Sequence, residues 1–158
     1  MKRTLSALGV LTMLLAAAPA IAQSKPSFAG KWTLVRPPNA APAGRGSLGQ
    51  DFTVSQNDKT LTTTSDNPER PDLNAVYNLD GTETRSSITF DGRSIERVSK
   101  ARWDGSKLVI ISTITLGGSN PYEATQTWSL DASGNLILEM SSNMVGMPPT
   151  TKATFKKV

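Results

Sequence analysis

The stretch that decides the fold is residues 95–130, IERVSKARWDGSKLVIISTITLGGSNPYEATQTWSL. It contains three runs in which apolar and polar residues alternate, separated by an Asp-Gly step and by a Gly-Gly-Ser-Asn-Pro segment. In the last run Trp128 and Leu130 alternate with polar residues such as Ser129. Alternation with a period of two places side chains on opposite faces of a strand. The stretch therefore predicts three consecutive antiparallel strands, each with one apolar face.

The same pattern continues on both sides, with Gly, Pro, Asn and Asp between short runs rich in Val, Ile, Thr and aromatic residues. No helical period of useful length is present. The predicted strands are Gly30–Arg36, Asp51–Gln56, Thr60–Thr64, Leu73–Leu79, Thr84–Phe90, Ile95–Trp103, Lys107–Leu116, Tyr122–Leu130, Leu136–Asn143 and Thr151–Lys157. The segment 37–50, rich in Pro, Gly and Ala, and the segment 65–72, which holds two prolines, are typical of loops.

Three Asp-Gly steps, at Asp80-Gly81, Asp91-Gly92 and Asp104-Gly105, are the strongest local signals. A tight hairpin turn needs a positive φ, which Gly tolerates best and Asp to a lesser degree. We therefore interpret these aspartates as turn formers and not as catalysts.

The strand count and the alternation together predict how the sheet is arranged. A long flat sheet would leave the apolar run Leu108–Leu116 near an exposed edge, where it invites aggregation. Closing the sheet removes that edge. The predicted fold class is all-β, a single antiparallel up-and-down barrel of about eight to ten strands.

The N-terminus has the features of a cleavable secretory signal. A basic start at Lys2-Arg3 precedes the apolar run Leu5–Ala18, and small residues at Ala20 and Ala22 suit cleavage before Gln23. The apolar run is shorter than the roughly 20 residues of a membrane-spanning helix. We therefore expect a signal peptide at residues 1–22 and one barrel domain at 23–158, in the periplasm or secreted.

Composition limits the function further. The chain has 17 basic and 13 acidic residues, and two of the basic ones lie in the signal, so the mature domain carries only about two net positive charges. Such a balance gives little support to nucleic-acid binding. The sequence contains no Cys and no His, which excludes disulfides, a lipid-anchored cysteine, and the familiar Ser-His-Asp and Cys-His catalytic arrangements.

The segment Phe28–Leu34 resembles the opening of lipocalin-like and fatty-acid-binding-protein-like barrels, where a Gly-x-Trp begins the first strand. Across the mature chain, the order of Tyr77–Gly81, Ala101–Gly105, Trp128–Leu130 and Thr154–Lys157 resembles exported bacterial lipocalin-like (calycin-type) proteins of uncharacterised function. The resemblance implies a small β-barrel in which Gly30 and Trp32 close one end as structural residues.

Two departures limit what the resemblance implies. Fatty-acid-binding barrels place two helices after the first strand, and here Pro37–Gly46 will not form them. Those barrels also carry an Arg two residues before the aromatic of the last strand, a position that is Ala153 here. A carboxylate-binding Arg therefore cannot be carried over, and the fold alone does not make this chain a lipid carrier.

Arg97 shares its predicted face with Ser99 and Ala101. If that face is interior, the guanidinium favours an anionic partner such as a ligand head group; otherwise it reaches solvent or pairs with a resident acid. The candidate ligand-binding residues are this arginine and the aromatic and aliphatic side chains predicted to face inward. They are Arg97, Trp103, Ile110, Tyr122, Trp128 and Leu138.

Other candidate chemistries are weaker. Met140, Met144 and Met147 suggest Cu(I) ligation, but core packing and a loop explain them better. Glu123 and Glu139 are predicted to face outward, so they do not form a carboxylate pair for glycoside hydrolysis. We predict no catalytic residues, no metal and no cofactor.

The sequence leaves two functions open. The first is a non-enzymatic, monomeric exported barrel that binds or carries a small hydrophobic or amphipathic molecule in the cell envelope, without nucleic acid or a stable membrane anchor. The alternative is an interaction or structural module with a filled barrel that works through its loops.

Overall fold

The computed structural model describes residues 25–36, 51–67, 73–90, 92–146, 148 and 150–158. These residues form ten strands and no α-helix. The strands are β1 (Gly30–Leu34), β2 (Phe52–Gln56), β3 (Thr60–Ser65), β4 (Ala75–Asn78), β5 (Thr84–Phe90), β6 (Arg93–Asp104), β7 (Lys107–Leu116), β8 (Tyr122–Leu130), β9 (Leu136–Ser142) and β10 (Thr150–Lys157). The predicted signal peptide and its cleavage site lie outside the described residues.

All ten strands belong to one antiparallel sheet in the order β4-β3-β2-β1-β10-β9-β8-β7-β6-β5. Neighbours in space are neighbours in sequence, except that β1 pairs with β10 through Trp32↔Lys157 and Leu34↔Phe155. The up-and-down antiparallel arrangement is therefore confirmed. The apolar β7 lies between β6 and β8, away from either edge of the sheet.

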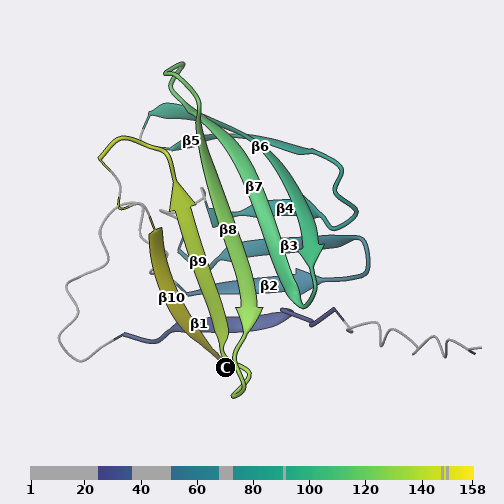
Figure 1. The fold of residues 1–158 in the computed structure, drawn as a ribbon. Coiled ribbons are helices and arrows are strands. Elements are labelled where there is room, and N and C mark those ends of the chain that lie inside the picture. Colours follow the sequence, from purple (N-terminus) through teal and green to yellow (C-terminus); the bar gives the residue numbers. More distant parts are fainter. Residues whose placement is uncertain (1–24, 37–50, 68–72, 91, 147, 149) are drawn as a thin grey trace, which may run out of the picture.

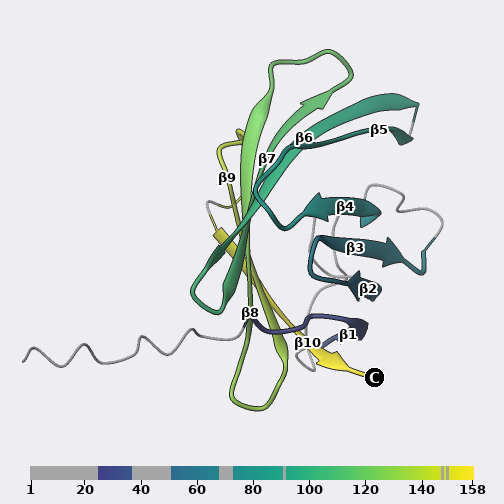
Figure 2. The same cartoon turned by 90° about the vertical axis from the view of Figure 1, so that its right-hand side faces the viewer.

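The sheet curls until its two ends approach each other (Figure 1), so that β7, β8 and β9 lie in front of β2, β3 and β4. The curl does not close completely, because no strand pairing joins β4 to β5 among the described residues. Figure 2 shows these two strands diverging from their short connection. The molecule is thus a nearly closed barrel, and we call the line between β4 and β5 the seam.

The three Asp-Gly steps have different outcomes. The glycines all take positive φ, 86° at Gly81, 69° at Gly92 and 59° at Gly105, as predicted. Gly92 and Gly105 lie in tight hairpins that extend β6 to Arg93–Asp104. Gly81, by contrast, connects two strands that do not pair, so the prediction of a hairpin there is wrong.

Local side-chain hydrogen bonds explain why the connection at Gly81 does not form a hairpin. The Asp80 carboxylate accepts hydrogen bonds from the Thr82 backbone N–H at 2.9 Å and from its hydroxyl at 2.6 Å. The Asn78 amide also donates to the Thr82 hydroxyl at 2.9 Å. This network folds residues 78–82 into a self-contained turn, of the kind that short polar side chains form locally. The chain leaves that turn without a ladder to β4.

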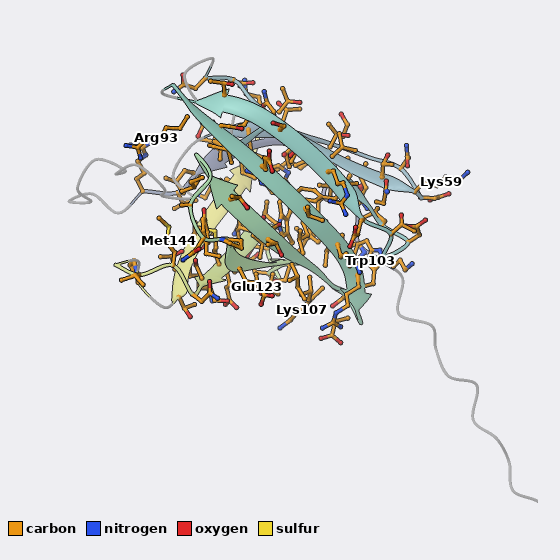
Figure 3. All side chains as sticks on the ribbon, turned by 90° about the horizontal axis from the view of Figure 1, so that it is seen from above. Lys59, Arg93, Trp103, Lys107, Glu123 and Met144 are labelled. Atoms are coloured by element: carbon orange, nitrogen blue, oxygen red, sulfur yellow. The ribbon has the colours of Figure 1, made fainter. Side chains whose placement is uncertain are left out.

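The hydrophobic core fills one end of the barrel. Its largest fully buried side chains come from the segment before β1 and from β1, β3, β7, β9 and β10; they are Phe28, Trp32, Leu61, Leu108, Ile110, Leu136 and Phe155. Aromatic rings make edge-to-face contacts there, with centroids 5.7 Å apart for Phe28–Trp128 and 5.0 Å apart for Phe52–Phe155. In the view of Figure 3, Trp103 and Lys107 lie toward one end of the barrel and Arg93 and Met144 toward the other.

Residues 25–29, which precede β1, cover this apolar end. Phe28 is completely buried and stacks on Trp103 with centroids 6.0 Å apart. Its carbonyl accepts a 2.8 Å hydrogen bond from the Trp32 indole, which is itself buried. Gly30 has φ 139°, a conformation that L side chains rarely adopt. The structure thus packs Gly30 and Trp32 at the covered end of the barrel.

The described residues contain no helix long and apolar enough to cross a membrane.

Candidate functional site

A cleft of about 450 Å³ lies along the seam, and we call it the seam cleft. Its lining comes from the last two strands at each end of the sheet, together with one residue of the β3–β4 connection. The lining residues are Thr62, Thr63, Thr64, Asn74, Ala75, Val76, Tyr77, Thr84, Arg85, Ser86, Arg97 and Ser99. The cleft exists because β4 and β5 do not pair.

Strand register divides these residues into inner walls and an outer lip. Thr63 pairs with Ala75, and Thr84 and Ser86 pair with Ser99 and Arg97. Cross-strand partners share a face, and Thr63, Ala75, Tyr77 and Ser99 are buried, so this set forms the inner walls. Thr62, Val76 and Arg85 belong to the opposite face, which meets solvent at the lip.

Arg97 projects from the inner wall of β6. Ser99 and Ala101, on the same face, are 3% and 1% exposed, so this face is interior, a point that the sequence left open. Arg97 itself is half-buried. Its guanidinium donates a hydrogen bond to the phenol oxygen of Tyr77 on β4. The two ends of the sheet, unpaired through their backbones, are thus joined here by side chains.

Tyr77 is buried beside Arg97. Burial raises the pKa of the phenol above its ordinary value of 10.0, because the charged phenolate would lose its hydration. The positive charge of Arg97 and its hydrogen bond act in the opposite direction. Tyr77 therefore stays a neutral phenol at physiological pH, able both to accept from Arg97 and to donate its own proton.

Hydroxyl groups make up most of the remaining inner wall. The Ser99 hydroxyl lies 2.8 Å from that of Ser112 on β7, where both residues are buried. The Thr63 hydroxyl donates to the Leu73 carbonyl at 2.7 Å. These bonds satisfy polar groups that would otherwise be costly to bury. They also fix the wall of the cleft in one arrangement.

The sequence-predicted ligand residues separate into two groups in the structure. Ile110, Trp128 and Leu138 are 0%, 2% and 4% exposed within the core, and Trp103 packs against it half-buried. Tyr122 is half-buried on β8 opposite Ile114, which pairs with Arg97. Only Arg97 of this set lines the seam cleft. Ligand contact by the other five stays a prediction.

Sequence reasoning did not single out Tyr77 or Ser99. Tyr77 had a usable signal, because it alternates with Ala75 in the predicted strand Leu73–Leu79. No signal in the sequence indicated its contact with Arg97, because the two residues lie on strands that do not pair. Only the curl of the whole sheet brings them together.

The structure also locates the residues that were considered for metal binding and for glycoside hydrolysis. Within the described residues, no three His, Cys, Asp or Glu side chains gather as a metal site. Glu123 is exposed, and Glu139 pairs with Lys152 at 3.1 Å on the outer surface. Met140 lies half-buried next to Leu138 on β9, Met144 is half-buried after β9, and Met147 lies outside the described residues.

Comparison with known proteins finds no protein-family model that matches this chain and no curated protein that is significantly similar to it.

Proposed function

We propose that the protein is an exported, non-catalytic binding protein that holds a small, partly apolar molecule in the seam cleft. The observation that carries the proposal is a cleft of about 450 Å³ whose walls combine a tyrosine ring and methyl groups with an arginine and several hydroxyls. Ligand sites are typically concave, partly apolar and supplied with a few convergent polar groups. Export rests on the predicted signal at residues 1–22, which cleavage before Gln23 would remove.

The position of the cleft determines how the molecule enters. The apolar end of the barrel is covered by Phe28 and Trp32 and filled by the aromatic core. The seam is open to solvent along Ser86, which is exposed. A ligand therefore enters from the side of the barrel, between β4 and β5, with Arg97 as its polar anchor.

The test begins with the gently purified mature protein, whose extract is analysed by mass spectrometry and which is titrated with a fluorescent fatty-acid probe. Ser86→Trp fills the inner wall at the seam, and Ser87→Trp is its control, because Ser87 is also exposed but lies on the opposite face of β5. We expect Ser86→Trp to weaken probe binding at least tenfold and Ser87→Trp to leave it within about twofold. An empty extract together with no probe binding by the wild type contradicts the proposal.

An interaction module is the second candidate function. The observation that favours it is β5, which pairs with β6 on one side only among the described strands. An unpaired edge offers backbone groups to an extended partner chain. This function would be favoured over the first if the wild-type protein binds no small molecule but captures a single protein partner. The Thr89→Lys variant should then lose that partner.

A further inference from the structure

The inner wall of the seam cleft is rich in hydrogen-bond donors and, among the residues that the structure describes, holds no carboxylate. Its side chains carry one guanidinium, one phenol and four aliphatic hydroxyls, from Arg97, Tyr77, Thr63, Thr84, Ser86 and Ser99. The Thr63 and Ser99 hydroxyls are bonded within the protein, to Leu73 and Ser112, so Thr84 and Ser86 supply the hydroxyls that face a ligand. Arg85 stands at the lip, where its charge is paired with Glu83 at 2.8 Å. Donors of this kind complement a molecule that brings oxygen acceptors of its own.

Arg97 and Tyr77 are the residues that complement a negatively charged group of such a molecule. A guanidinium presents five N–H groups in a rigid planar fork, whose geometry suits a carboxylate. One of its hydrogen bonds goes to the Tyr77 oxygen, which fixes its position between β4 and β6. The phenol O–H is a second donor beside the same fork. Hydrogen bonds with an ionised partner are about twice as strong as those between neutral groups.

The hydroxyls lie on both sides of that pair. Thr84 and Ser86 lie on β5 opposite Ser99 and Arg97, and Thr63 lies on β3 next to β4. The Thr84 hydroxyl is 3.4 Å from the Ser99 carbonyl, a long contact that a better acceptor would displace. A ligand hydroxyl beside its carboxylate would therefore find both donors and acceptors within the same wall.

We propose that the molecule held in the seam cleft is a small hydroxylated carboxylic acid, with its carboxylate on Arg97 and Tyr77 and its hydroxyl against Thr84 and Ser86. The inference rests on the proposed function and names the chemical class of its ligand. Its aliphatic part lies against Ala75 and the ring of Tyr77, which are the apolar parts of the inner wall.

Four six-carbon probes test the inference by varying charge and hydroxyl separately: 3-hydroxyhexanoate, hexanoate, 3-hydroxyhexanamide and hexanamide. Calorimetric titration of the mature protein measures each. We expect each acid to bind about tenfold or more tightly than its amide, and the hydroxyl to add a further few-fold. Raised salt should reduce the advantage of the acids, because it screens the charge of Arg97.

Arg97→Gln is the deciding variant, and Arg102→Gln is its control, because Arg102 is exposed on the outer face of the same strand. We expect Arg97→Gln to bring each acid to within about twofold of its amide, and Arg102→Gln to preserve the difference. Tyr77→Phe should reduce it by a smaller factor. If Arg97→Gln does not fold, as judged by circular dichroism, Arg97→Lys takes its place and should weaken acid binding several-fold.

The outcomes separate this inference from the function on which it rests. Equal binding of acids and amides, blocked by Ser86→Trp, would overturn the anionic ligand and leave the binding function standing. No binding of any probe, with an empty extract and no binding of the fatty-acid probe, would remove both. Tight binding of hexanoate with no gain from the hydroxyl would overturn the hydroxylated class.

Discussion

Tyr77 and Arg97 meet although they lie on strands that do not pair. Burial raises the pKa of the phenol, so that at neutral pH the contact joins the guanidinium to an uncharged hydroxyl. The sequence places Arg97 on one face with Ser99 and Ala101 but leaves open whether that face is interior, and the burial of both neighbours shows that it is. The alternation could not reveal its partner, because a period of two assigns faces and says nothing about which distant strand lies opposite.

The raised pKa of Tyr77 predicts a loss of stability at alkaline pH. The pKa is higher in the folded than in the unfolded state, so this contribution to stability is complete below the ordinary value of 10.0 and is lost as pH rises through the folded value. We expect Tyr77→Phe to be less stable by about 0.5–1.5 kcal/mol at neutral pH, through loss of the hydroxyl. Its free energy of unfolding should then fall less above pH 10.0 than that of the wild type.

Urea unfolding of both proteins at neutral and alkaline pH measures this difference. The pKa of Lys31 is also raised, through its hydrogen bond to Asp66, but that contribution is common to both proteins and cancels. Equal alkaline losses in wild type and Tyr77→Phe would contradict the prediction. In a Tyr122→Phe background, ultraviolet absorbance of the phenolate follows Tyr77 directly and should rise only above pH 10.0.

Among the elements, those with strong alternation and clear turns were predicted best. The bounds of β5, β7 and β8 agree with the sequence prediction, because Gly92 and Gly105 set the hairpins on both sides of β6. The predicted strand Leu73–Leu79 is shorter in the structure, where β4 covers Ala75–Asn78. The β4–β5 connection could not be predicted, since Asp80-Gly81 has the same local signal as the true hairpins and only the Thr82 network distinguishes it.

The segment before β1 was not predicted as an element, yet it completes the core. Phe28 is fully buried between Trp103 and Trp128. We expect Phe28→Ala to lower the free energy of unfolding by about 3–5 kcal/mol, the usual cost of removing a buried aromatic side chain. Ser27→Ala, at an exposed neighbouring position, should change it by no more than about 0.5 kcal/mol. Chemical denaturation measures both, and similar small effects would show that the segment does not stabilise the barrel.

At the scale of the whole molecule, the sequence predicted a barrel but not where it opens or which part is filled. Ile110, Trp128 and Leu138 were correctly placed on inner faces. Whether an inner face borders a cavity or a packed core depends on side chains from distant segments, here Phe28 and Phe52, and the local pattern does not contain that information. The seam cleft adjoins this core through Ala75 and Tyr77, at the two ends of the curled sheet.

The nearly closed barrel predicts an uneven distribution of local stability. Strands β7 and β8 have partners on both sides, whereas β4 and β5 have one each among the described strands. In native-state hydrogen exchange we expect the paired amides of β7 and β8 to exchange only through global unfolding, and those of β4 and β5 to exchange faster by local opening. Saturation with 3-hydroxyhexanoate should slow exchange in β4 and β5 selectively. Uniform protection across all ten strands would contradict this distribution.

The pairing of β1 with β10 has a consequence for how the chain folds. Every other ladder joins consecutive strands, whose connections are much shorter than the span from β1 to β10, and the hairpins from β5 to β10 can form early and independently. The β1–β10 ladder joins segments from opposite ends of the described chain and carries the largest entropic cost of closure. Until it forms, the β1–β4 arm is tethered to the rest of the sheet only through the turn at Gly81. The same connection that leaves the seam open in the folded protein is therefore the hinge about which the two halves of the nascent sheet must meet.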